Sequence, residues 1–274
     1  MSDTIPAPGH PGRRQYLERD GLRLSYLDFG GPAERTLVCL HGRSGNARNF
    51  VPLQQALAQT TPGDDYRIVA LDLRGHGWSG HSDDGSRDAF IADAAALIRH
   101  LDCGPVLLLG HSLGGVAAYQ TAARHPDLVR ALAVEDIGCR FGPPPEEESW
   151  PTRWASLGQF LAFMRSTPIG MNPLLLDNLV EYEDGWGFRF SDDNYRAMRQ
   201  GLTGDWSDDW AAIRCPLLLM HGSQSWALDA AEAARMAALN PRTELHTFAA
   251  GHVIHDDRPA EFAAVLRDFL ARHG

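Results

Sequence analysis

The sequence contains no lysine, so all 25 of its basic residues are arginines. A lysine Schiff base, and with it most pyridoxal-phosphate and class I aldolase chemistry, is therefore excluded. With a formal net charge of −10, the chain also lacks the basic excess by which proteins displace counterions from nucleic acid. The same acidity disfavours an anionic membrane surface. Composition thus favours a small-molecule substrate over a nucleic-acid or membrane partner.

Cysteine is scarce as well. The four cysteines (Cys39, Cys103, Cys139 and Cys215) are far apart and form no Cys-x-x-Cys pair. Most lie in or beside apolar runs, where a free thiol packs as a small hydrophobic group, so we expect neither a disulfide nor a zinc site. No apolar run reaches the length of about 18 residues that a membrane helix requires. The N-terminal segment also lacks the apolar core of a secretory signal, so we expect a soluble cytoplasmic protein.

Apolar runs and helical patterns alternate along much of the chain, as in proteins with a parallel sheet. Its 274 residues, 44% of them hydrophobic, suffice for one large sheet domain with an insertion. A hairpin is predicted over 15–29, around Asp20-Gly21. The predicted strands are 36–40, 67–71, 106–109, 129–134, 217–220 and 244–248, and the predicted helices are 47–59, 87–101, 113–125, 230–239 and 259–272. We therefore predict an α/β fold, with a mainly parallel twisted sheet flanked by helices.

The alternation stops after Gly138 and resumes after Trp210. The intervening segment opens with a proline-rich and then acidic stretch, and it gives only short helical patterns, at 153–164 and 192–202. It is typical of a helical lid inserted into a sheet domain. The predicted units are a loose N-terminal arm at 1–14, a core formed by 15–138 and 211–274, and a lid at 139–210.

Five of the seven tryptophans fall in the predicted lid. Aromatic side chains on its inner face would line an apolar substrate pocket. The alternative is that they only dock the insertion on the core. The residues that we expect to contact substrate are Trp154, Phe160 and Trp186 in the lid and Trp226 after it.

A candidate nucleophile stands in the stretch Gly110-His111-Ser112-Leu113-Gly114. This stretch follows a predicted buried strand and opens a predicted helix, which is the context of a Gly-x-Ser-x-Gly nucleophile elbow. On so tight a turn the serine takes an unfavourable backbone conformation that lifts its hydroxyl clear of the sheet edge. The flanking positions are crowded, so only glycine fits there. We predict that Ser112 is the nucleophile and that His111, which points away from it in such a turn, has a structural role.

Three further motifs give nearly the whole chain a resemblance to the α/β-hydrolase superfamily. Leu40–Asn46 (LHGRSGN) resembles the oxyanion loop after the third strand of that family. Asp72–Ser79 (DLRGHGWS) resembles the structural turn after the fourth strand, and Gly251–His255 (GHVIH) resembles the catalytic-histidine loop. The resemblance implies an α/β-hydrolase fold with a serine nucleophile, and it implies no metal and no cofactor.

A serine hydroxyl needs a neighbouring base, and His252 is the best candidate among twelve histidines. Its local competitor is His255, whose position in the family packs near the mouth of the site. A metal site at these two histidines is disfavoured, because a further well-placed ligand is missing. The resemblance implies that the backbone N–H groups of Arg43 and Leu113 form an oxyanion hole. The Arg43 side chain either binds an acidic substrate group or lies at the surface.

The sequence offers more than one position for the acid partner of the histidine. The family usually places it after the strand that here is 217–220, where this chain has Trp226, and the later Asp229 begins an N-cap pattern. Some α/β-hydrolases carry the acid after the sixth strand, where this chain has Glu135 and Asp136. Strand alternation sends Glu135 to the opposite face unless the chain bends. Asp136 is therefore the preferred acid, and it keeps the chain order Ser…Asp…His.

With Ser112, Asp136 and His252 in these roles, we expect a serine hydrolase that cleaves an ester or lactone of a largely apolar small molecule through an acyl-enzyme. C–C bond hydrolysis or a cofactor-free lyase reaction with the same triad is a second interpretation, which no residue excludes. A non-catalytic receptor for a small ligand is a third, favoured by Trp226 at the usual acid position and disfavoured by an intact Asp136. The oligomeric state, a homodimer included, is left open by the sequence.

Overall fold

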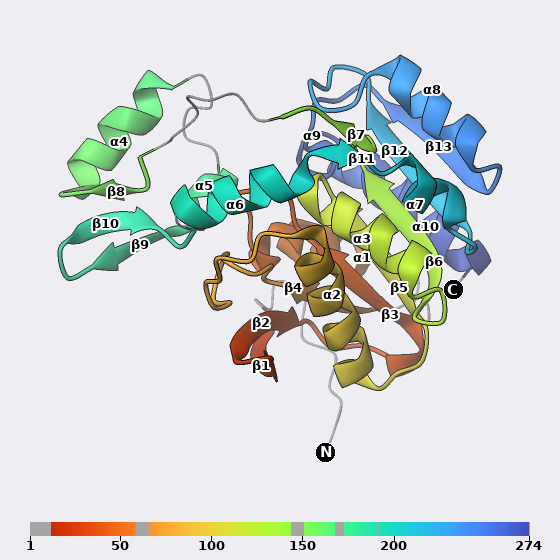
Figure 1. The fold of residues 1–274 in the computed structure, drawn as a ribbon, viewed down its shortest axis with the longest axis horizontal. Coiled ribbons are helices and arrows are strands. Elements are labelled where there is room, and N and C mark those ends of the chain that lie inside the picture. The colour runs from red at the N-terminus through yellow and green to blue at the C-terminus, as the bar shows by residue number, and fades with distance from the viewer. Residues whose placement is uncertain (1–11, 59–65, 144–150, 168–172, 191, 274) are drawn as a thin grey trace.

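A computed structural model describes residues 12–58, 66–143, 151–167, 173–190 and 192–273. An eight-stranded sheet forms the centre of the molecule (Figure 1). In their order across the sheet, the strands are β1 (Arg13–Arg19), β2 (Leu22–Asp28), β4 (Arg67–Leu71), β3 (Thr36–Leu40), β5 (Val106–His111), β6 (Val129–Glu135), β12 (Leu217–Gly222) and β13 (Thr243–Phe248). Neighbouring strands from β4 to β13 are parallel, whereas β1, β2 and β4 pair antiparallel. The predicted mainly parallel sheet is confirmed.

Helices cover both faces of this sheet, because its strands are apolar on both sides. Successive strand residues point to opposite faces, and in β3 Val38 and Leu40 join one buried cluster while Leu37 and Cys39 join another. On the first face lie α2 (Arg87–Leu101), α3 (Leu113–Arg124), α7 (Ser207–Ala212) and α8 (Ala230–Leu239), and on the second lie α1 (Val51–Ala58) and α10 (Pro259–His273). Each large aliphatic side chain buried in these layers contributes roughly 1.5–3 kcal/mol.

The hairpin at the start of the sheet forms where the sequence predicts it. Asp20 and Gly21 have positive φ angles of 50° and 80°, as a two-residue type I′ turn requires. The predicted helix 47–59 is interrupted, since its first turn is tighter than an α-helix and only the rest forms α1. The remaining short elements of the core are η1 (Ala33–Arg35), η2 (Ala47–Phe50) and α9 (Ile254–Asp257).

Between β6 and β12 the chain leaves the main sheet. β7 (Arg140–Phe141) pairs with β11 (Gly204–Asp205), so the beginning and the end of the insertion are joined. Farther out, β8 (Arg153–Trp154), β9 (Leu179–Tyr182) and β10 (Gly185–Phe188) form an antiparallel sheet, accompanied by α4 (Leu157–Ser166), α5 (Pro173–Leu176) and α6 (Asp192–Leu202). Figure 1 shows α4 and this small sheet to one side of the main sheet. Sequence analysis missed the small sheet, because strands this short give almost no periodic signal.

The insertion has a hydrophobic core of its own, which includes Trp154, Phe160 and Phe188. Trp210, by contrast, is fully buried in the main core, where its indole N–H donates to Met236 O at 2.8 Å. The sequence places Trp210 at the end of the predicted lid, because the sheet pattern resumes only after it. In the structure it belongs to α7 and anchors that helix on the sheet.

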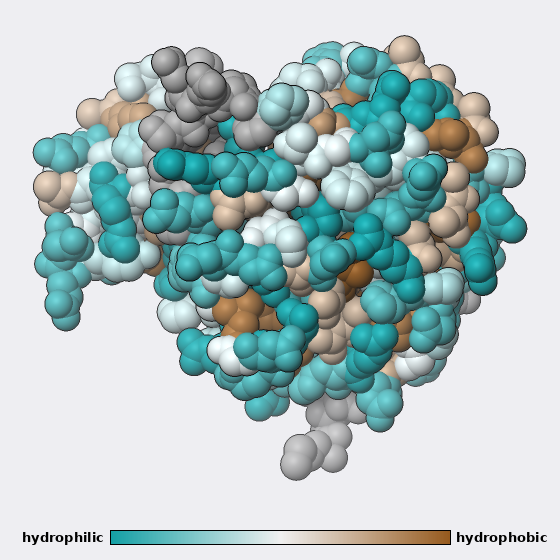
Figure 2. Space-filling view, in the orientation of Figure 1, coloured by the Kyte–Doolittle hydropathy of each residue, from teal (hydrophilic) through white to brown (hydrophobic). Residues whose placement is uncertain are grey.

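The surface seen in Figure 2 is largely hydrophilic, with smaller hydrophobic patches between the polar groups. Within the described part of the chain, no helix combines the length and the apolar character needed to cross a membrane. All four cysteines are free thiols, and Cys39 and Cys139 are buried. Burial raises the pKa of the Cys39 thiol, so this group stays protonated and packs as an apolar side chain.

Candidate active site

Ser112 stands at the turn between β5 and α3, with a backbone φ of 51° and ψ of −121°. A positive φ is strained for a serine, and the surrounding structure must enforce it. A Cβ added to Gly110 would lie 2.3 Å from Gly114 O, and one added to Gly114 would lie 2.2 Å from Leu40 O. Both contacts are far inside van der Waals distance, so the turn requires glycine at both positions. The geometry is that of the predicted nucleophile elbow.

Asp136 and His252 are brought together from two loops at the same edge of the sheet. His252 Nδ1 lies 2.8 Å from Asp136 Oδ2. Asp136 is fully buried, and its carboxylate also accepts a hydrogen bond from Gly222 N–H at 2.8 Å and one from the Ser225 hydroxyl. These donors satisfy a charge that is costly to bury alone. Because the carboxylate accepts from Nδ1, the other ring nitrogen of His252, Nε2, is left as the basic one.

Glu135, the alternative acid, serves a different histidine. Its Oε2 lies 2.8 Å from His255 Nδ1, and the His255 backbone N–H donates to Oε1 at 3.0 Å. Burial opposes ionisation of Glu135, but the nearby rings of His255 and His111 outweigh burial and hold its pKa at about 2. Burial likewise lowers the pKa of His255, yet Glu135 leaves it raised. His255 is therefore part of a buried ion pair, and it lines a cavity together with His252.

His111 links the elbow to the histidine loop. Its Nε2 lies 3.0 Å from His252 O, and the two ring centroids are 4.8 Å apart. Burial lowers the pKa of His111 to about 4, so the ring is neutral at pH 7. A neutral ring has one N–H group, which donates to the His252 carbonyl from Nε2. These contacts give His111 a structural role.

The loop after β3 approaches the nucleophile closely. A Cβ added to Gly42 would lie 2.7 Å from His111 Nδ1 and 3.2 Å from Ser112 Cβ, so a larger residue here would force the elbow to shift. His41 fixes the loop, with Nδ1 2.7 Å from Gly42 O and Nε2 accepting from Leu73 N–H at 3.0 Å. Arg43 follows in this loop, and Leu113 opens α3, where the first N–H groups have no acceptor within the helix. The two segments predicted to supply the oxyanion hole therefore meet at Ser112.

Asn178, between α5 and β9, ties the insertion to this loop. Its side chain is fully buried. Its Nδ2 donates to Ser44 O at 2.7 Å, and its Oδ1 accepts from Asn46 Nδ2 at 3.1 Å. Sequence analysis did not single out Asn178, because its partners are more than 130 residues away in the chain. It is a candidate positioning residue for the oxyanion loop.

Ser112 opens into a cavity of about 310 Å³. The apolar part of its lining includes Leu113, Ile137, Phe141, Met198, Leu202 and Trp226. Three arginines, Arg43, Arg140 and Arg199, also line it. Of these, sequence analysis named Arg43, Leu113 and Trp226. The others come from the insertion and its base, where no local pattern predicts which side chains face the serine.

The three lid aromatics expected to contact substrate lie elsewhere. Trp154 and Phe160 pack on each other in the core of the insertion, with ring centroids 5.0 Å apart, and Trp186 pairs with Trp154 across β10 and β8. None of the three is among the residues that line the Ser112 cavity. That expectation is therefore corrected. A small sheet and a single helix must bury aromatic side chains against each other to be stable.

Trp226 lies at the mouth of the cavity. It is 76% exposed, and its ring centroid is 4.7 Å from that of His252. The residue at the family's usual acid position thus covers the histidine, while Asp229 further on caps α8 by accepting from Glu232 N–H at 2.7 Å. The carboxylate of Glu232 binds Arg235 and Arg140.

Within the described residues, Ser112 and His252 are not joined by a hydrogen bond in this structure. His252 lines a separate cavity of about 940 Å³ together with Asn49 and Val253. The ring is nevertheless held at Nδ1 by Asp136. Over the same described residues, no group of three or more His, Cys, Asp or Glu side chains is placed to hold a metal ion.

The class of α/β-fold hydrolases is defined by a mainly parallel sheet with a serine elbow at its edge. A carboxylate and a histidine that contact each other follow the serine along the chain. The sequence profile of the Alpha/beta hydrolase family matches residues 37–265, and the chain belongs to this family. The protein is therefore a hydrolase by family, and the predicted fold and enzyme class are confirmed.

Two curated relatives and one solved structure illustrate the likeness. The chain is 29% identical to the sn-1-specific diacylglycerol lipase ABHD11 of Mus musculus, over 91% of this chain and 86% of that protein. It is 27% identical to the 2-(acetamidomethylene)succinate hydrolase of Mesorhizobium japonicum, over 85% and 87% of the two chains. The crystal structure of E-2-(acetamidomethylene)succinate hydrolase matches with a TM-score of 0.80 at 21% identity, over 94% and 99% of the two chains.

Proposed function

We propose that this protein hydrolyses an ester or lactone of a small molecule through an acyl-enzyme, with Ser112 as nucleophile, His252 as base and Asp136 as acid. The observation that carries the proposal is the 2.8 Å contact between His252 Nδ1 and the buried Asp136 carboxylate. This contact supports a ring protonated at Nδ1, so that Nε2 can take the proton of the serine.

In the first half of the reaction, Ser112 Oγ attacks the carbonyl carbon while His252 Nε2 takes the hydroxyl proton. The hydrogen bond between these two atoms forms when substrate binds, since such contacts are often long in a free enzyme. The backbone N–H groups of Leu113 and Arg43 donate to the oxyanion, and loss of one such donor would raise the barrier by about 3 kcal/mol.

The second half of the reaction returns the enzyme to its starting state. The alcohol of the ester departs with the proton that His252 holds, which leaves the acyl group on Ser112. His252 then takes a proton from a water molecule, whose oxygen attacks the acyl carbon. The carboxylic acid departs, the proton returns to Ser112, and no cofactor is consumed.

The cavity supports a small substrate with a largely apolar body. Its volume of about 310 Å³ and its side chains such as Leu113, Phe141 and Met198 fit an aliphatic or aromatic group beside the ester. Trp226 at the mouth would cover that group. The names of the two relatives, a diacylglycerol lipase and a succinate-derivative hydrolase, agree on hydrolysis and differ in substrate. Hydrolysis is therefore what we carry over to this chain.

The proposal is tested by replacing Ser112 with Ala. Turnover of p-nitrophenyl butyrate should fall to the rate in buffer, and labelling by a fluorophosphonate should disappear, because the attacking oxygen is gone. The matched control is Ser223→Ala, which removes the exposed hydroxyl of another serine. This variant should keep both the turnover and the labelling. Turnover or labelling that survives in S112A at an unchanged melting temperature would rule out the proposed nucleophile.

A further inference from the structure

Ser112 and His252 line different cavities. Ser112 lines the cavity of about 310 Å³, together with Arg43 and Leu113, whose backbone N–H groups are the proposed oxyanion donors. His252 lines the cavity of about 940 Å³, which has Val51 and other residues of α1 and α9 in its wall. Among the described residues, none lines both cavities. The two residues that the proposed mechanism requires therefore adjoin two separate spaces.

An ester has two parts, and the chemistry assigns each part to one of these residues. The acyl carbon bonds to Ser112 Oγ and its oxygen accepts from the oxyanion donors, so the acyl part stays beside Ser112 after the first half of the reaction. The alcohol oxygen takes its proton from His252 Nε2, so it has to lie within about 3 Å of that atom. The alcohol part of the substrate therefore begins at His252.

The ring of His252 is held by neighbours on several sides. Its Nδ1 lies 2.8 Å from the buried carboxylate of Asp136. The rings of Trp226 and His111 lie close to it, with centroids 4.7 Å and 4.8 Å away. A leaving group has to reach the ring where these neighbours leave it open, and the cavity of about 940 Å³ is a space that His252 lines. This cavity is therefore the candidate site for the alcohol part.

A third cavity, of about 830 Å³, does not offer the alcohol part such a position. Among the described residues that line it, there is neither Ser112 nor His252. It adjoins the cavity above Ser112, because Phe141 and Trp226 belong to the walls of both. An acyl part too long for the cavity above Ser112 would therefore have to pass these two aromatic side chains.

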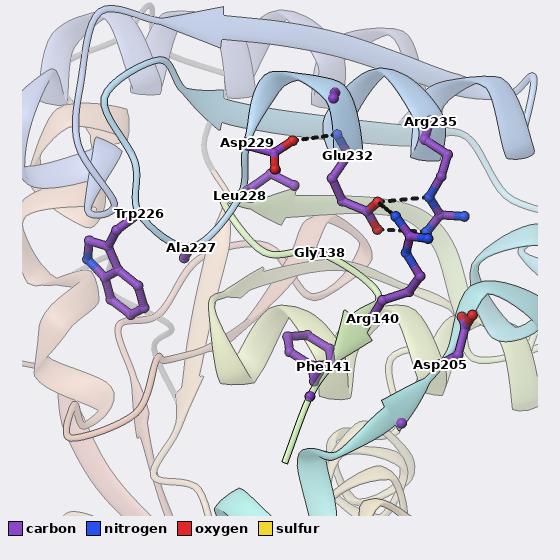
Figure 3. Close-up of a pocket in the computed structure, with 13 residues that line it drawn as sticks. Gly138, Arg140, Phe141, Asp205, Trp226, Ala227, Leu228, Asp229, Glu232 and Arg235 are labelled. Atoms are coloured by element: carbon purple, nitrogen blue, oxygen red, sulfur yellow. Dashed lines mark hydrogen bonds and ion pairs between the residues drawn. The ribbon is translucent and has the colours of Figure 1, made fainter. Parts of the chain in front are cut away.

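The third cavity is a poor site for a long apolar acyl part. Figure 3 shows Glu232 between Arg140 and Arg235 in its wall, and both ion pairs have distances of 2.6 Å. Two further carboxylates, Asp205 and Asp229, also line it. A hydrocarbon chain lying over these groups would remove them from water without supplying hydrogen bonds, which is unfavourable. The acyl part is therefore limited to groups that fit above Ser112.

The two candidate subsites differ about threefold in size. A volume of about 310 Å³ is at the lower end of the range for small-molecule sites, and about 940 Å³ is near its upper end. Val51, Pro52 and Val253 give the larger cavity apolar surface. We propose that the substrate is an ester of a short acid with a larger alcohol that carries an apolar group, and that this alcohol part binds in the cavity beside His252. The inference rests on the proposed function and adds the class of substrate.

Pairs of isomeric esters in which the large group changes sides test this proposal. 2-Phenylethyl acetate carries its phenyl group on the alcohol, and methyl 3-phenylpropanoate carries it on the acid. Hexyl acetate and methyl heptanoate form an aliphatic pair. Titration of the released acid at constant pH measures both members of a pair in the same way. We expect kcat/KM to favour the acetate over its isomer by roughly 10-fold to 100-fold, because burial of one large apolar group contributes about this much.

Substitutions in the two walls assign the preference to the cavities. Val51→Phe narrows the cavity beside His252, and Leu202→Phe narrows the cavity above Ser112. V51F should reduce the ratio of kcat/KM for 2-phenylethyl acetate to that for methyl 3-phenylpropanoate by about 10-fold, and L202F should raise this ratio by about 3-fold or more. Each ratio is measured on one preparation, so a loss of folded protein does not change it. Leu245→Phe, at an exposed position of β13 outside both cavities, is the matched control and should leave the ratio unchanged.

The outcomes separate this inference from the proposed function. Equal kcat/KM for the two isomers of each pair, or a preference for the methyl esters, would overturn the inference. Hydrolysis of p-nitrophenyl butyrate without hydrolysis of 2-phenylethyl acetate would do the same. A ratio that V51F leaves unchanged would exclude the cavity beside His252 as the site of the alcohol part. In each of these cases Ser112-dependent hydrolysis stands, whereas turnover that persists in S112A would remove the proposed function itself.

Discussion

Replacing Asp136 by Asn changes one atom of the triad and keeps its shape. In the wild type, Oδ1 accepts from Gly222 N–H and Oδ2 accepts from His252 Nδ1, both at 2.8 Å. The amide oxygen of Asn can still accept from Gly222. Its NH₂ group then faces His252 Nδ1, and two donors cannot share one hydrogen bond. The ring must move its proton from Nδ1 to Nε2, and the base that Ser112 needs is lost.

The expected loss of kcat is large because the substitution changes the protonation state of His252. The packing around position 136 stays intact. A related triad loses about 10⁴ in kcat upon this substitution, which corresponds to about 5 kcal/mol of transition-state stabilisation. The free energy of unfolding should change much less, by about 1 kcal/mol, since the buried group keeps most of its hydrogen bonds. Activity and stability should therefore separate clearly in D136N.

Glu135→Gln is the matched comparison, because it alters an adjacent buried carboxylate that also contacts a histidine. We expect kcat for p-nitrophenyl butyrate to fall less than about 10-fold in E135Q, while breaking the buried pair with His255 lowers the free energy of unfolding by about 3 kcal/mol. Steady-state kinetics and urea unfolding of both variants measure the two effects. If D136N keeps more than a tenth of wild-type kcat, the assignment of Asp136 as the triad acid is wrong.

Two further outcomes follow from the same contacts. The ion pair of Glu135 and His255 should make the free energy of unfolding depend on pH in two windows. The contribution of Glu135 is lost as pH falls from about 4.5 towards about 2, because its pKa is lowered in the folded state. The contribution of His255 is lost as pH rises above 6.5, because its pKa is raised in the folded state. Urea unfolding should show the largest difference between wild type and E135Q between those windows, and a constant difference from pH 3 to pH 9 would contradict this. Asn178→Ala should lower the free energy of unfolding by about 1–3 kcal/mol and should affect kcat more than KM, because the hydrogen bonds of Asn178 to Ser44 and Asn46 in the oxyanion loop are lost. Steady-state kinetics identical to wild type would show that Asn178 does not position the loop.

The fold was largely predictable from sequence because its signals are local. Continuous apolar runs and amphipathic periods gave the ends of five elements correctly, at 36–40, 67–71, 87–101, 192–202 and 230–239. Such patterns depend on side chains a few residues apart, so they can be recognised in the sequence without the tertiary structure. The small sheet of the insertion was missed for the opposite reason, since its strands are only two to four residues long.

The candidate site was predictable only in part. The position of the nucleophile is predictable because the turn is so crowded that it requires glycine at Gly110 and Gly114, and these glycines are visible in the sequence. The acid of the triad is not predictable in this way, because Glu135 and Asp136 are neighbours and the choice between them depends on where the chain bends. In the structure Asp136 has a positive φ of 53° just beyond β6, and the two carboxylates consequently bind different histidines.

The sequence by itself determined the order of strands and helices, the glycines of the elbow and the short set of side chains able to act as nucleophile, base and acid. Each of these depends on neighbours within a single turn, strand or helix. Only the tertiary structure decided that Asp136 binds His252, that Asn178 holds the oxyanion loop, and that Arg43, Arg140 and Arg199 share one cavity. Those groups meet because the parallel sheet brings the ends of distant strands to one edge, and no local pattern encodes which side chains converge there.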